Sequence, residues 1–357
     1  MTNRKKILYV ASTASHLHRF HEPYIAALRK DYDVLTLANG DGVDFSVSIS
    51  KKMLTIRHLA TIRKIRRICR AEHFDAVIVN TTLAAALVRL ALRRVKPRPH
   101  LLNVVHGYLF SAPPQGLRDR ILLWCERRLA KQTDVVAVMN EHDRNAASAY
   151  ALSAGEIRSM RGMGLSPFAI TSPDDRLRLL FAAPHDLLLT FVGELSYRKN
   201  QIFLVRAVAR LREEGLPVRL LLVGEGSERK KLIRTIGKLG LSGAVFLVGN
   251  REPVLPYLAV TDLYVSASRS EGLPFNILEA MQCGLPVIAS RVRGQEDLLS
   301  DNSLYPLDDM DAFCAAVRRY AEGARGVSSV SYPNLGKYLL PAVFEENLKI
   351  LRSGVDS

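Results

Sequence analysis

The feature of this sequence that most restricts its fold is an alternation of short apolar runs with amphipathic stretches, which occurs twice along the chain. In the first half this pattern predicts strands at residues 7–11, 34–37, 76–79, 101–105 and 135–138, and helices at 21–29, 54–70, 83–94 and 117–131. In the second half it predicts strands at 187–192, 218–223, 244–248, 263–265 and 286–289, and helices at 200–214, 227–239, 254–260, 275–283 and 312–321. Alternating units of this size are typical of a doubly wound parallel sheet with helices on both faces.

The alternation is interrupted at residues 166–185, where Pro, Ser and Asp break the apolar pattern and predict a linker. A length of 357 residues also favours two domains, because one domain usually takes roughly 150 residues. The sequence therefore predicts an α/β protein with two parallel-sheet domains. Ligands of such sheets bind at the carboxyl ends of the strands, so we expect a central cleft between those ends.

The composition excludes several other classes of protein. At 48% hydrophobic and 24% charged residues, the chain is neither disordered nor collagen-like. Its four cysteines stand far apart, which excludes a disulfide scaffold and a Cys-x-x-Cys metal site, and predicts a reducing compartment. The basic residues 4–6 precede only five apolar residues, too few for a secretory signal, and we expect a cytoplasmic protein.

Positive charge is concentrated in the first half of the chain. Residues 1–170 carry 27 Lys and Arg against 13 Asp and Glu, whereas residues 171–357 carry 23 against 22. In the predicted helix 54–70, Leu59, Ile62, Ile65 and Cys69 share an apolar face, and Arg63, Lys64, Arg67 and Arg70 share a basic one. This basic face is either an ordinary solvated surface or an attachment to anionic lipid. Binding to nucleic acid is not expected, because Phe74 is the only aromatic residue in 51–100.

The strongest local motif covers residues 268–284. A strand is predicted to end before it, Pro274 suits a first helical turn, and Gly284 suits the helix end. A helix that starts at such a strand end presents free N–H groups to a phosphate. Glu271 and Glu279 lie on either side of this start, and two carboxylates there indicate recognition of hydroxyl groups. The alternative is that Glu271 only interacts with the helix dipole and that Glu279 is solvated.

This Glu-x7-Glu motif resembles the signature of retaining family 4 glycosyltransferases, most of all the bacterial capsule and exopolysaccharide branch. The resemblance extends over both halves of the chain, through residues 15–24, 89–91, 105–107, 140–143, 193–201, 271–287 and 293–298. It implies the GT-B fold, in which two Rossmann-like doubly wound parallel-sheet domains face a central cleft. Residues 1–165 would form the acceptor-side domain, with a C-terminal helix 342–352 packed back on it, and residues 166–341 would bind the nucleotide sugar.

The resemblance also implies roles for residues of the second domain. Glu279 would bind the ribose and Glu271 the donor sugar, while Lys199 would neutralise the leaving diphosphate. Many members of the family have an arginine at the position of Glu194, and Arg198 is the candidate to replace it. The remaining predicted donor-site residues are Gly193, Gly272, Leu273, Pro274, Phe275 and Asn276 around the diphosphate, and Asn250 and Arg251 near the nucleobase.

In the first domain the resemblance implies that His106 contacts the donor sugar or the reacting phosphate. The alternative for His106 is a histidine whose ring is satisfied by the backbone at a strand end. Ser15, His16, His21 and Asn140 are predicted on the acceptor side. The group His16, His18 and His21 suggests a metal site, but Glu22 is the only carboxylate nearby, and we expect neither a metal nor another cofactor.

The predicted function is transfer of a sugar from a nucleotide sugar, by family habit a UDP-sugar, to a lipid-linked or growing polysaccharide acceptor with retention of configuration. The protein would be cytoplasmic, with the inner face of the plasma membrane as a partner through helix 54–70. Two alternatives remain at this point: a nucleotide-sugar epimerase of the same fold, and a non-catalytic membrane-associated subunit.

Overall fold

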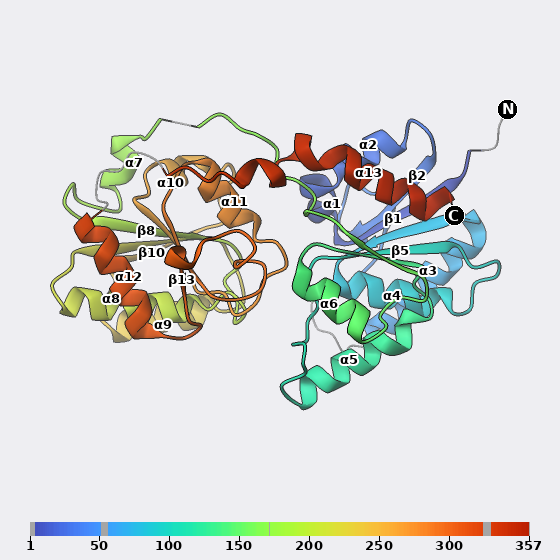
Figure 1. The fold of residues 1–357 in the computed structure, drawn as a ribbon, viewed down its shortest axis with the longest axis horizontal. Coiled ribbons are helices and arrows are strands. Elements are labelled where there is room, and N and C mark those ends of the chain that lie inside the picture. The colour runs from blue at the N-terminus through green and yellow to red at the C-terminus, as the bar shows by residue number, and fades with distance from the viewer. Residues whose placement is uncertain (1–3, 51–55, 171, 324–329, 357) are drawn as a thin grey trace. The chain divides into compact units, whose positions relative to one another are not determined.

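The computed structural model describes residues 4–50, 56–170, 172–323 and 330–356. The chain divides into two compact units (Figure 1). The N-terminal unit comprises residues 1–164 together with 337–357, and the C-terminal unit comprises residues 165–336. Each unit contains one parallel sheet between layers of helices, as the alternation in the sequence predicts.

The sheet of the N-terminal unit has the order β3-β2-β1-β4-β5-β6-β7. Its strands are β1 (Lys6–Thr13), β2 (Asp33–Asn39), β3 (Phe45–Ser46), β4 (Ala76–Asn80), β5 (His100–Val105), β6 (Val135–Val138) and β7 (Glu156–Ser159). In register, Leu8 of β1 pairs with Leu35 of β2 and Val77 of β4. The chain order reverses between β1 and β4, so the ends of these two strands are the expected ligand-binding edge. There Ser12 Oγ and Thr81 Oγ1 are hydrogen-bonded at 2.6 Å.

Helices cover this sheet on both faces. They are α1 (Ala14–Phe20), α2 (Glu22–Leu28), α3 (Arg57–Glu72), α4 (Thr82–Leu92), α5 (Leu117–Ala130), α6 (Glu141–Ala149) and α13 (Leu340–Asp356). Although α13 ends the chain, it belongs to this unit and contacts α2, β4 and β5. Asn347 on α13 donates hydrogen bonds to the Tyr24 hydroxyl at 2.9 Å and the Gly162 carbonyl at 2.7 Å. No helix among the described residues is long and apolar enough to cross a membrane.

The C-terminal unit contains a sheet of order β10-β9-β8-β11-β12-β13. The strands are β8 (Leu187–Val192), β9 (Val218–Val223), β10 (Val245–Gly249), β11 (Leu263–Ser266), β12 (Val287–Ser290) and β13 (Leu304–Tyr305). The helices are α7 (Asp175–Leu179), α8 (Gln201–Glu213), α9 (Arg229–Lys238), α10 (Leu255–Ala259), α11 (Phe275–Gln282) and α12 (Met310–Gly323), with a 3-10 turn at Asp301–Ser303 and another, Leu335–Tyr338, at the boundary with the N-terminal unit. The order reverses between β8 and β11, which again defines the expected ligand-binding edge.

Several local predictions were wrong or incomplete. The residues between the predicted strand 7–11 and the predicted helix 21–29 were expected to form a loop, but they contain helix α1, which begins where the Thr13 side chain accepts the His16 N–H at 3.3 Å. The predicted linker contains the short helix α7, which Asp174 caps. The sequence pattern missed α6 and the edge strands β3, β7 and β13.

The predicted helix 54–70 corresponds to α3, and its residues 54 and 55 lie outside the described residues. Its buried face differs from the predicted apolar stripe. Ile65 and Cys69 are buried as predicted, but Leu59 is 52% exposed and Thr61 faces inward. The Thr61 hydroxyl donates to the Ser48 carbonyl at 2.6 Å, and this hydrogen bond helps fix which side of α3 turns to the sheet.

Candidate functional site

In the C-terminal unit, the loop after β8 lies close to the loops that follow β9 and β11, the two neighbours of β8 in the sheet. Gly193 follows β8 with a φ of +146°, and a Cβ on Gly224 would lie only 2.0 Å from the Gly193 carbonyl oxygen. The loop after β8 then continues through Lys199 to α8, which begins at Gln201. A second loop follows β11, and its Arg269 N–H donates to the Arg198 carbonyl at 2.8 Å. The two loops are therefore joined through their backbones.

These loops carry three charged side chains that form an ionic cluster: Arg198, Lys199 and Glu271. Lys199 Nζ lies 2.6 Å from one carboxylate oxygen of Glu271, and Arg198 lies 2.7 Å from the other. The side chains of Lys199 and Glu271 are 9% and 6% exposed, whereas that of Arg198 is 44% exposed. The cluster places two cations and one carboxylate at the reversal point. Their contact could not be predicted from the sequence, because Lys199 and Glu271 are 72 positions apart.

Burial and charge act in opposite directions on this cluster. Burial alone would raise the pKa of Glu271, but the adjacent charges of Lys199 and Arg198 outweigh it and lower the pKa to about 2. Burial lowers the pKa of the Lys199 ammonium, and the Glu271 carboxylate opposes that shift. The carboxylate is therefore ionised at neutral pH, and its charge holds the ammonium in position.

Helix α11 begins directly after the ionic cluster, with Pro274 in the preceding extended position. Asn276, in its first turn, donates to the Val192 carbonyl at 2.9 Å and to the Tyr264 hydroxyl at 2.8 Å, which ties the helix start to the end of β8. A Cβ on Gly294 would lie 2.3 Å from the Gly272 carbonyl oxygen, so the loop after β12 supports this turn closely. The structure therefore brings Gly193, Lys199, Glu271 and the start of α11 to one edge of the sheet.

The other predicted donor-site residues lie farther out on this edge. Glu279 is buried in the second turn of α11, at 8% exposure. Asn250 and Arg251 are exposed and follow β10, the edge strand of the sheet. The Gly224 N–H donates to the Gly249 carbonyl at 2.8 Å, which joins the end of β10 to the glycine beside Gly193.

The N-terminal unit contains a second group of functional side chains, the imidazole cluster of His16, His21 and His106. His16 lies on α1, His21 joins α1 to α2, and His106 follows β5. Their ring centroids are separated by 5.0 to 5.6 Å. The Nε2 atoms of all three are buried and have no hydrogen-bond partner among the described residues, while His21 Nδ1 lies 3.0 Å from the Tyr9 hydroxyl.

Burial keeps these imidazoles neutral. It lowers the pKa of His16 to about 4, and burial together with the charge of His16 lowers that of His106 to about 3. The pKa of His21 is lowered well below its usual value, first by burial and then by the two other histidines. Among the described residues, burial and the neighbouring histidines set these pKa values, and no carboxylate contributes to stabilising the charged rings.

Among the described residues, this cluster is the group whose side chains could hold a metal ion, since its ligand atoms lie within 4.8 Å of one another. The histidine group suggested by the sequence was different. His18 instead faces away, with Nδ1 3.7 Å from the Glu22 carboxylate and half of its side chain exposed. His106 is the third member instead. It follows β5, which lies two strands from β1 in the sheet, so the strand order brings it next to His16 and His21.

The remaining acceptor-side candidates have local structural partners. The Asn140 side chain accepts the Asp143 N–H and donates to the Asp143 carboxylate, each at 2.7 Å, and so caps α6. Asp143 in turn accepts the Tyr108 N–H at 3.4 Å, which supports the loop that begins at His106. Ser15 is exposed in the first turn of α1, with its hydroxyl 3.2 Å from that of Thr13.

Comparison with known proteins agrees with this architecture. Residues 186–322 match the family described as “Glycosyl transferases group 1”, and residues 8–161 match the “Glycosyl transferase 4-like domain”. The chain is similar to the putative glycosyltransferase EpsD of Bacillus subtilis, at 29% identity over 88% of this chain and 87% of that one. It is also 30% identical, over 87% of this chain and 83% of the relative, to a GDP-mannose-dependent phosphatidylinositol monomannoside mannosyltransferase of Mycolicibacterium smegmatis.

Solved structures show the same fold. A structure of Anabaena Alr3699/HepE with UDP and glucose superposes with a TM-score of 0.76 at 20% identity, over 98% of this chain and all of that one. Sucrose-phosphate synthase of Thermosynechococcus elongatus gives 0.80 at 18% identity, over 98% and 99%. The predicted GT-B fold is therefore confirmed. The chain belongs to the family 4, group 1 glycosyltransferases, enzymes that use nucleotide sugars.

Proposed function

We propose that this glycosyltransferase moves a sugar from a UDP-sugar to a lipid-linked or growing polysaccharide acceptor, with retention of configuration, in capsule or exopolysaccharide biosynthesis. The observation that carries the proposal is the ionic cluster of Arg198, Lys199 and Glu271 beside the start of α11. Relatives support the donor and the pathway. One is an Escherichia coli UDP-Gal-dependent galactosyltransferase that acts on a GlcNAc-diphosphoundecaprenol, at 25% identity, and another is the amylovoran glycosyltransferase AmsD of Erwinia amylovora, at 28%.

In this proposal the ionic cluster stabilises the departing diphosphate. Negative charge develops on the leaving group during the reaction, and cations that are already fixed in place stabilise it without reorganisation. Lys199 is fixed by its ion pair with Glu271. Arg198 supplies a second cation and so replaces the arginine that many family members carry at the position of Glu194. The backbone N–H groups at the start of α11, around Leu273 and Phe275, add partial positive charge.

The carboxylates bind hydroxyl groups in this scheme. Glu271 has a low pKa, so it accepts hydrogen bonds from hydroxyls of the donor sugar rather than donating a proton. Glu279, one turn into α11, binds the ribose hydroxyls, and Asn250 and Arg251 lie near the nucleobase. No carboxylate needs to act as a covalent nucleophile, because the leaving phosphate can accept the acceptor proton.

The imidazole cluster acts on the uncharged part of the reactants. The partly exposed His106 contacts a sugar hydroxyl, and the partly exposed His16 lies beside it on the acceptor side, while the fully buried His21 packs against both rings. Because all three rings are neutral at pH 7, they recognise hydroxyl groups without adding charge to the diphosphate site.

Thermal unfolding in the presence of UDP, GDP, ADP and a set of UDP-sugars tests the donor proposal. Ligand at a hundred times its dissociation constant stabilises the folded state by about 2.7 kcal/mol. We expect a UDP-selective rise in Tm that Lys199→Ala and Glu279→Ala abolish and the exposed control Lys230→Ala retains. The absence of a rise with every nucleotide would overturn the proposal.

The two alternatives predict different products. An epimerase converts the nucleotide sugar without an acceptor and releases no UDP, whereas a non-catalytic subunit binds the donor and leaves it intact. Release of UDP that depends on an added lipid-diphosphate acceptor distinguishes the transferase from both, and the glycosylated lipid is identified by mass spectrometry.

A further inference from the structure

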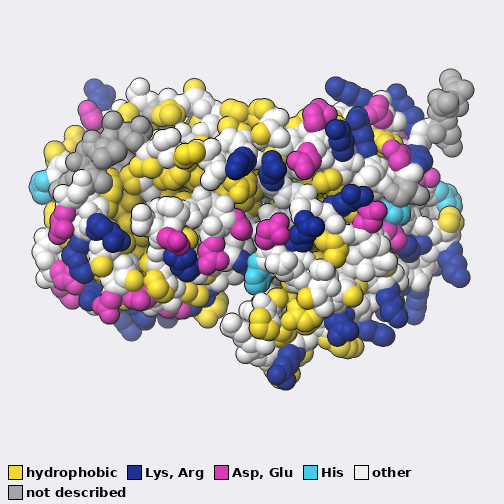
Figure 2. Space-filling model, viewed as in Figure 1, with side chains coloured by type: hydrophobic (Ala, Val, Ile, Leu, Met, Phe, Trp, Pro, Cys, Tyr) yellow, Lys and Arg dark blue, Asp and Glu magenta, His cyan; other side chains and the backbone are white. Residues whose placement is uncertain are grey.

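Helix α5 carries an exposed apolar stripe on the outside of the N-terminal unit. Leu117, Ile121 and Trp124 are 75%, 52% and 63% exposed, and their spacing of four and three residues places them on one side of the helix. Figure 2 shows hydrophobic and basic side chains next to each other at the lower edge of this unit, where Figure 1 places α5. Large apolar side chains gathered in this way on a soluble unit indicate a contact surface.

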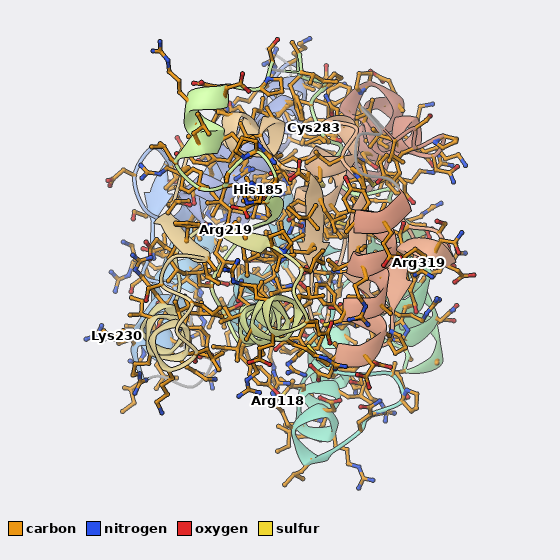
Figure 3. The ribbon with its side chains drawn as sticks, turned by 90° about the vertical axis from the view of Figure 1, so that its left-hand side faces the viewer. Arg118, His185, Arg219, Lys230, Cys283 and Arg319 are labelled. Atoms are coloured by element: carbon orange, nitrogen blue, oxygen red, sulfur yellow. The ribbon has the colours of Figure 1, made fainter. Side chains whose placement is uncertain are left out.

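The exposed charges around this stripe are all positive. They belong to Arg118, Arg120, Arg127, Arg128 and, just beyond the helix, Lys131. Figure 3 labels Arg118 beside the first turn of α5. The two acidic residues of α5 are turned inward: Asp119 accepts the Ser111 N–H at 3.0 Å, and Glu126 forms a two-bond ion pair with the buried Arg89 at 2.8 and 3.1 Å.

An apolar groove of about 310 Å³ lies beside this helix, between α3, α4, α5 and the loop after β5. Its lining includes Leu59, Ile62, Leu83, Leu90, Leu109 and Leu122. At its α3 side Ile56 is 86% exposed and Leu59, as noted, is also exposed. Arg63, Lys64 and Arg67 on the outer face of α3 extend the basic surface to the other side of the groove.

We propose that this surface, formed by the outer face of α5 and the groove beside it, binds the face of an anionic phospholipid bilayer. The apolar stripe enters the region between headgroups and acyl chains, and the groove accepts an acyl chain. The arginines and Lys131 contact the phosphate groups, and their long side chains allow the charged ends to stay in the headgroup layer.

Charge complementarity and apolar area together select this partner. A nucleic acid would match the cations but leave the apolar stripe and groove without contacts. A purely apolar partner would leave at least four arginine side chains without counter-charges. An interfacial tryptophan is favoured at the boundary of a bilayer, since its ring has an apolar body and a polar N–H. The proposal goes beyond glycosyl transfer, because it depends only on the N-terminal unit's surface and not on the donor.

The chain contains one tryptophan, so Trp124 reports directly on this surface. The experiment titrates the whole protein with vesicles of phosphatidylcholine alone, or with one quarter phosphatidylglycerol, and follows the emission of Trp124. We expect a blue shift with the anionic vesicles and quenching by lipids brominated on the acyl chain. Ile121→Glu should weaken binding at least about tenfold, because it places a charge in the apolar layer.

The matched control is Ile233→Glu. Ile233 is 50% exposed on α9, a second basic helix that belongs to the C-terminal unit. This variant changes the net charge equally and should bind the vesicles as the unmodified protein does. A second variant, Arg120→Gln with Arg128→Gln, should weaken binding to anionic vesicles and reduce its dependence on salt.

Three results would overturn the proposal: binding without a blue shift, equal weakening by Ile121→Glu and Ile233→Glu, or no binding to anionic vesicles. The UDP-dependent rise in Tm is measured on the same variants. Because Ile121 lies in the other unit from the ionic cluster, Ile121→Glu should retain this rise, which also shows that the variant is folded. Failure of the lipid proposal is thereby distinguished from failure of the proposed donor site.

Discussion

The ionic cluster of the C-terminal unit and the imidazole cluster of the N-terminal unit both bury titratable side chains, but one buries them charged and paired and the other buries them neutral. Both lie where loops leave the carboxyl ends of parallel strands, next to the point where the strand order reverses. In the ionic cluster, Glu271 is buried and charged because Lys199 and Arg198 hold both of its oxygens. In the imidazole cluster, His16, His21 and His106 are buried without counter-charges and are neutral.

Under the proposed function, this difference suits each cluster to a different part of the reactants. A leaving diphosphate gains charge during the reaction, so it needs cations that are already held in place. Sugar hydroxyls are uncharged and are recognised by neutral hydrogen-bonding groups. The following predictions test this difference in charge between the two clusters. They are given in order of decreasing expected effect.

The largest effect is expected from Lys199→Met. It removes the buried cation and leaves the Glu271 carboxylate with Arg198 alone. Breaking a buried ion pair typically costs about 3–5 kcal/mol of stability, and loss of a transition-state contact of this kind costs about 10²–10³ in kcat. Denaturant unfolding and initial rates with a UDP-sugar measure the two effects.

The double variant Lys199→Met with Glu271→Gln separates stability from catalysis. It removes both charges, so we expect stability to recover by more than half while activity stays low. Recovery of activity would contradict the role of Lys199 at the diphosphate.

A smaller loss is expected from His106→Ala, which deletes one hydrogen-bonding ring of the imidazole cluster. We predict a fall in kcat of about 10²-fold with little change in the affinity for UDP, because the proposed nucleotide site lies in the other unit. His18→Ala is the control, since His18 lies on α1 but faces solvent. Equal losses from both variants would show that the effect is structural.

The two clusters should affect stability in different ranges of pH, because their side chains titrate at different pH values. The unfolded chain binds protons on its histidines as the pH falls below about 6.5, whereas native His16 and His106 resist protonation until their pKa values of about 4 and 3. Because the unfolded state then binds more protons, stability falls with decreasing pH, by about 1.4 kcal/mol per unit for each such histidine.

Glu271 acts in a lower range of pH. Its native pKa of about 2 lies below its unfolded value of about 4.3, so its contribution is lost only as the pH falls from there toward 2. We therefore expect His106→Gln to flatten the dependence from pH 6.5 down to about 3, and Glu271→Gln to alter it only below about pH 4.5, so that the range between pH 6.5 and 4.5 reports on the histidines. Unfolding curves across pH 3–8 provide the measurement, and a change in the wrong range would refute the assignment.

The smallest effect is expected from removal of metal ions. A tetrahedral zinc site has Zn–N distances of about 2.0–2.1 Å, which places its nitrogens roughly 3.4 Å apart, and the ligand atoms here are within 4.8 Å of one another. We predict that EDTA leaves glycosyl transfer unchanged. If EDTA abolished activity, zinc restored it, and zinc failed to restore it in His16→Ala, the imidazole cluster would hold a metal.

The two clusters also differ in how far the sequence predicts them. Glu271 and the start of α11 belong to one continuous motif. Lys199 belongs to a second family motif, residues 193–201, so all of these residues were identified as candidates. Their direct contact was not, because 72 residues separate Lys199 from Glu271 and the sheet brings them together. The pattern His16, His18 and His21 suggested a group that the structure does not form, since His18 and His21 are close in sequence but only His21 faces inward.

By itself, the sequence determined the α/β class, most of the strands and helices, and the motif at α11 with Gly284 at the helix end. These features depend on local periodicity and on backbone conformations that few residues adopt. Only the tertiary structure decided that His106 joins His16 and His21, that Thr61 rather than Leu59 faces the sheet, and that α5 exposes Trp124 among cations. Each of these depends on strand order and helix rotation, and those are set by packing between segments that lie far apart in the chain.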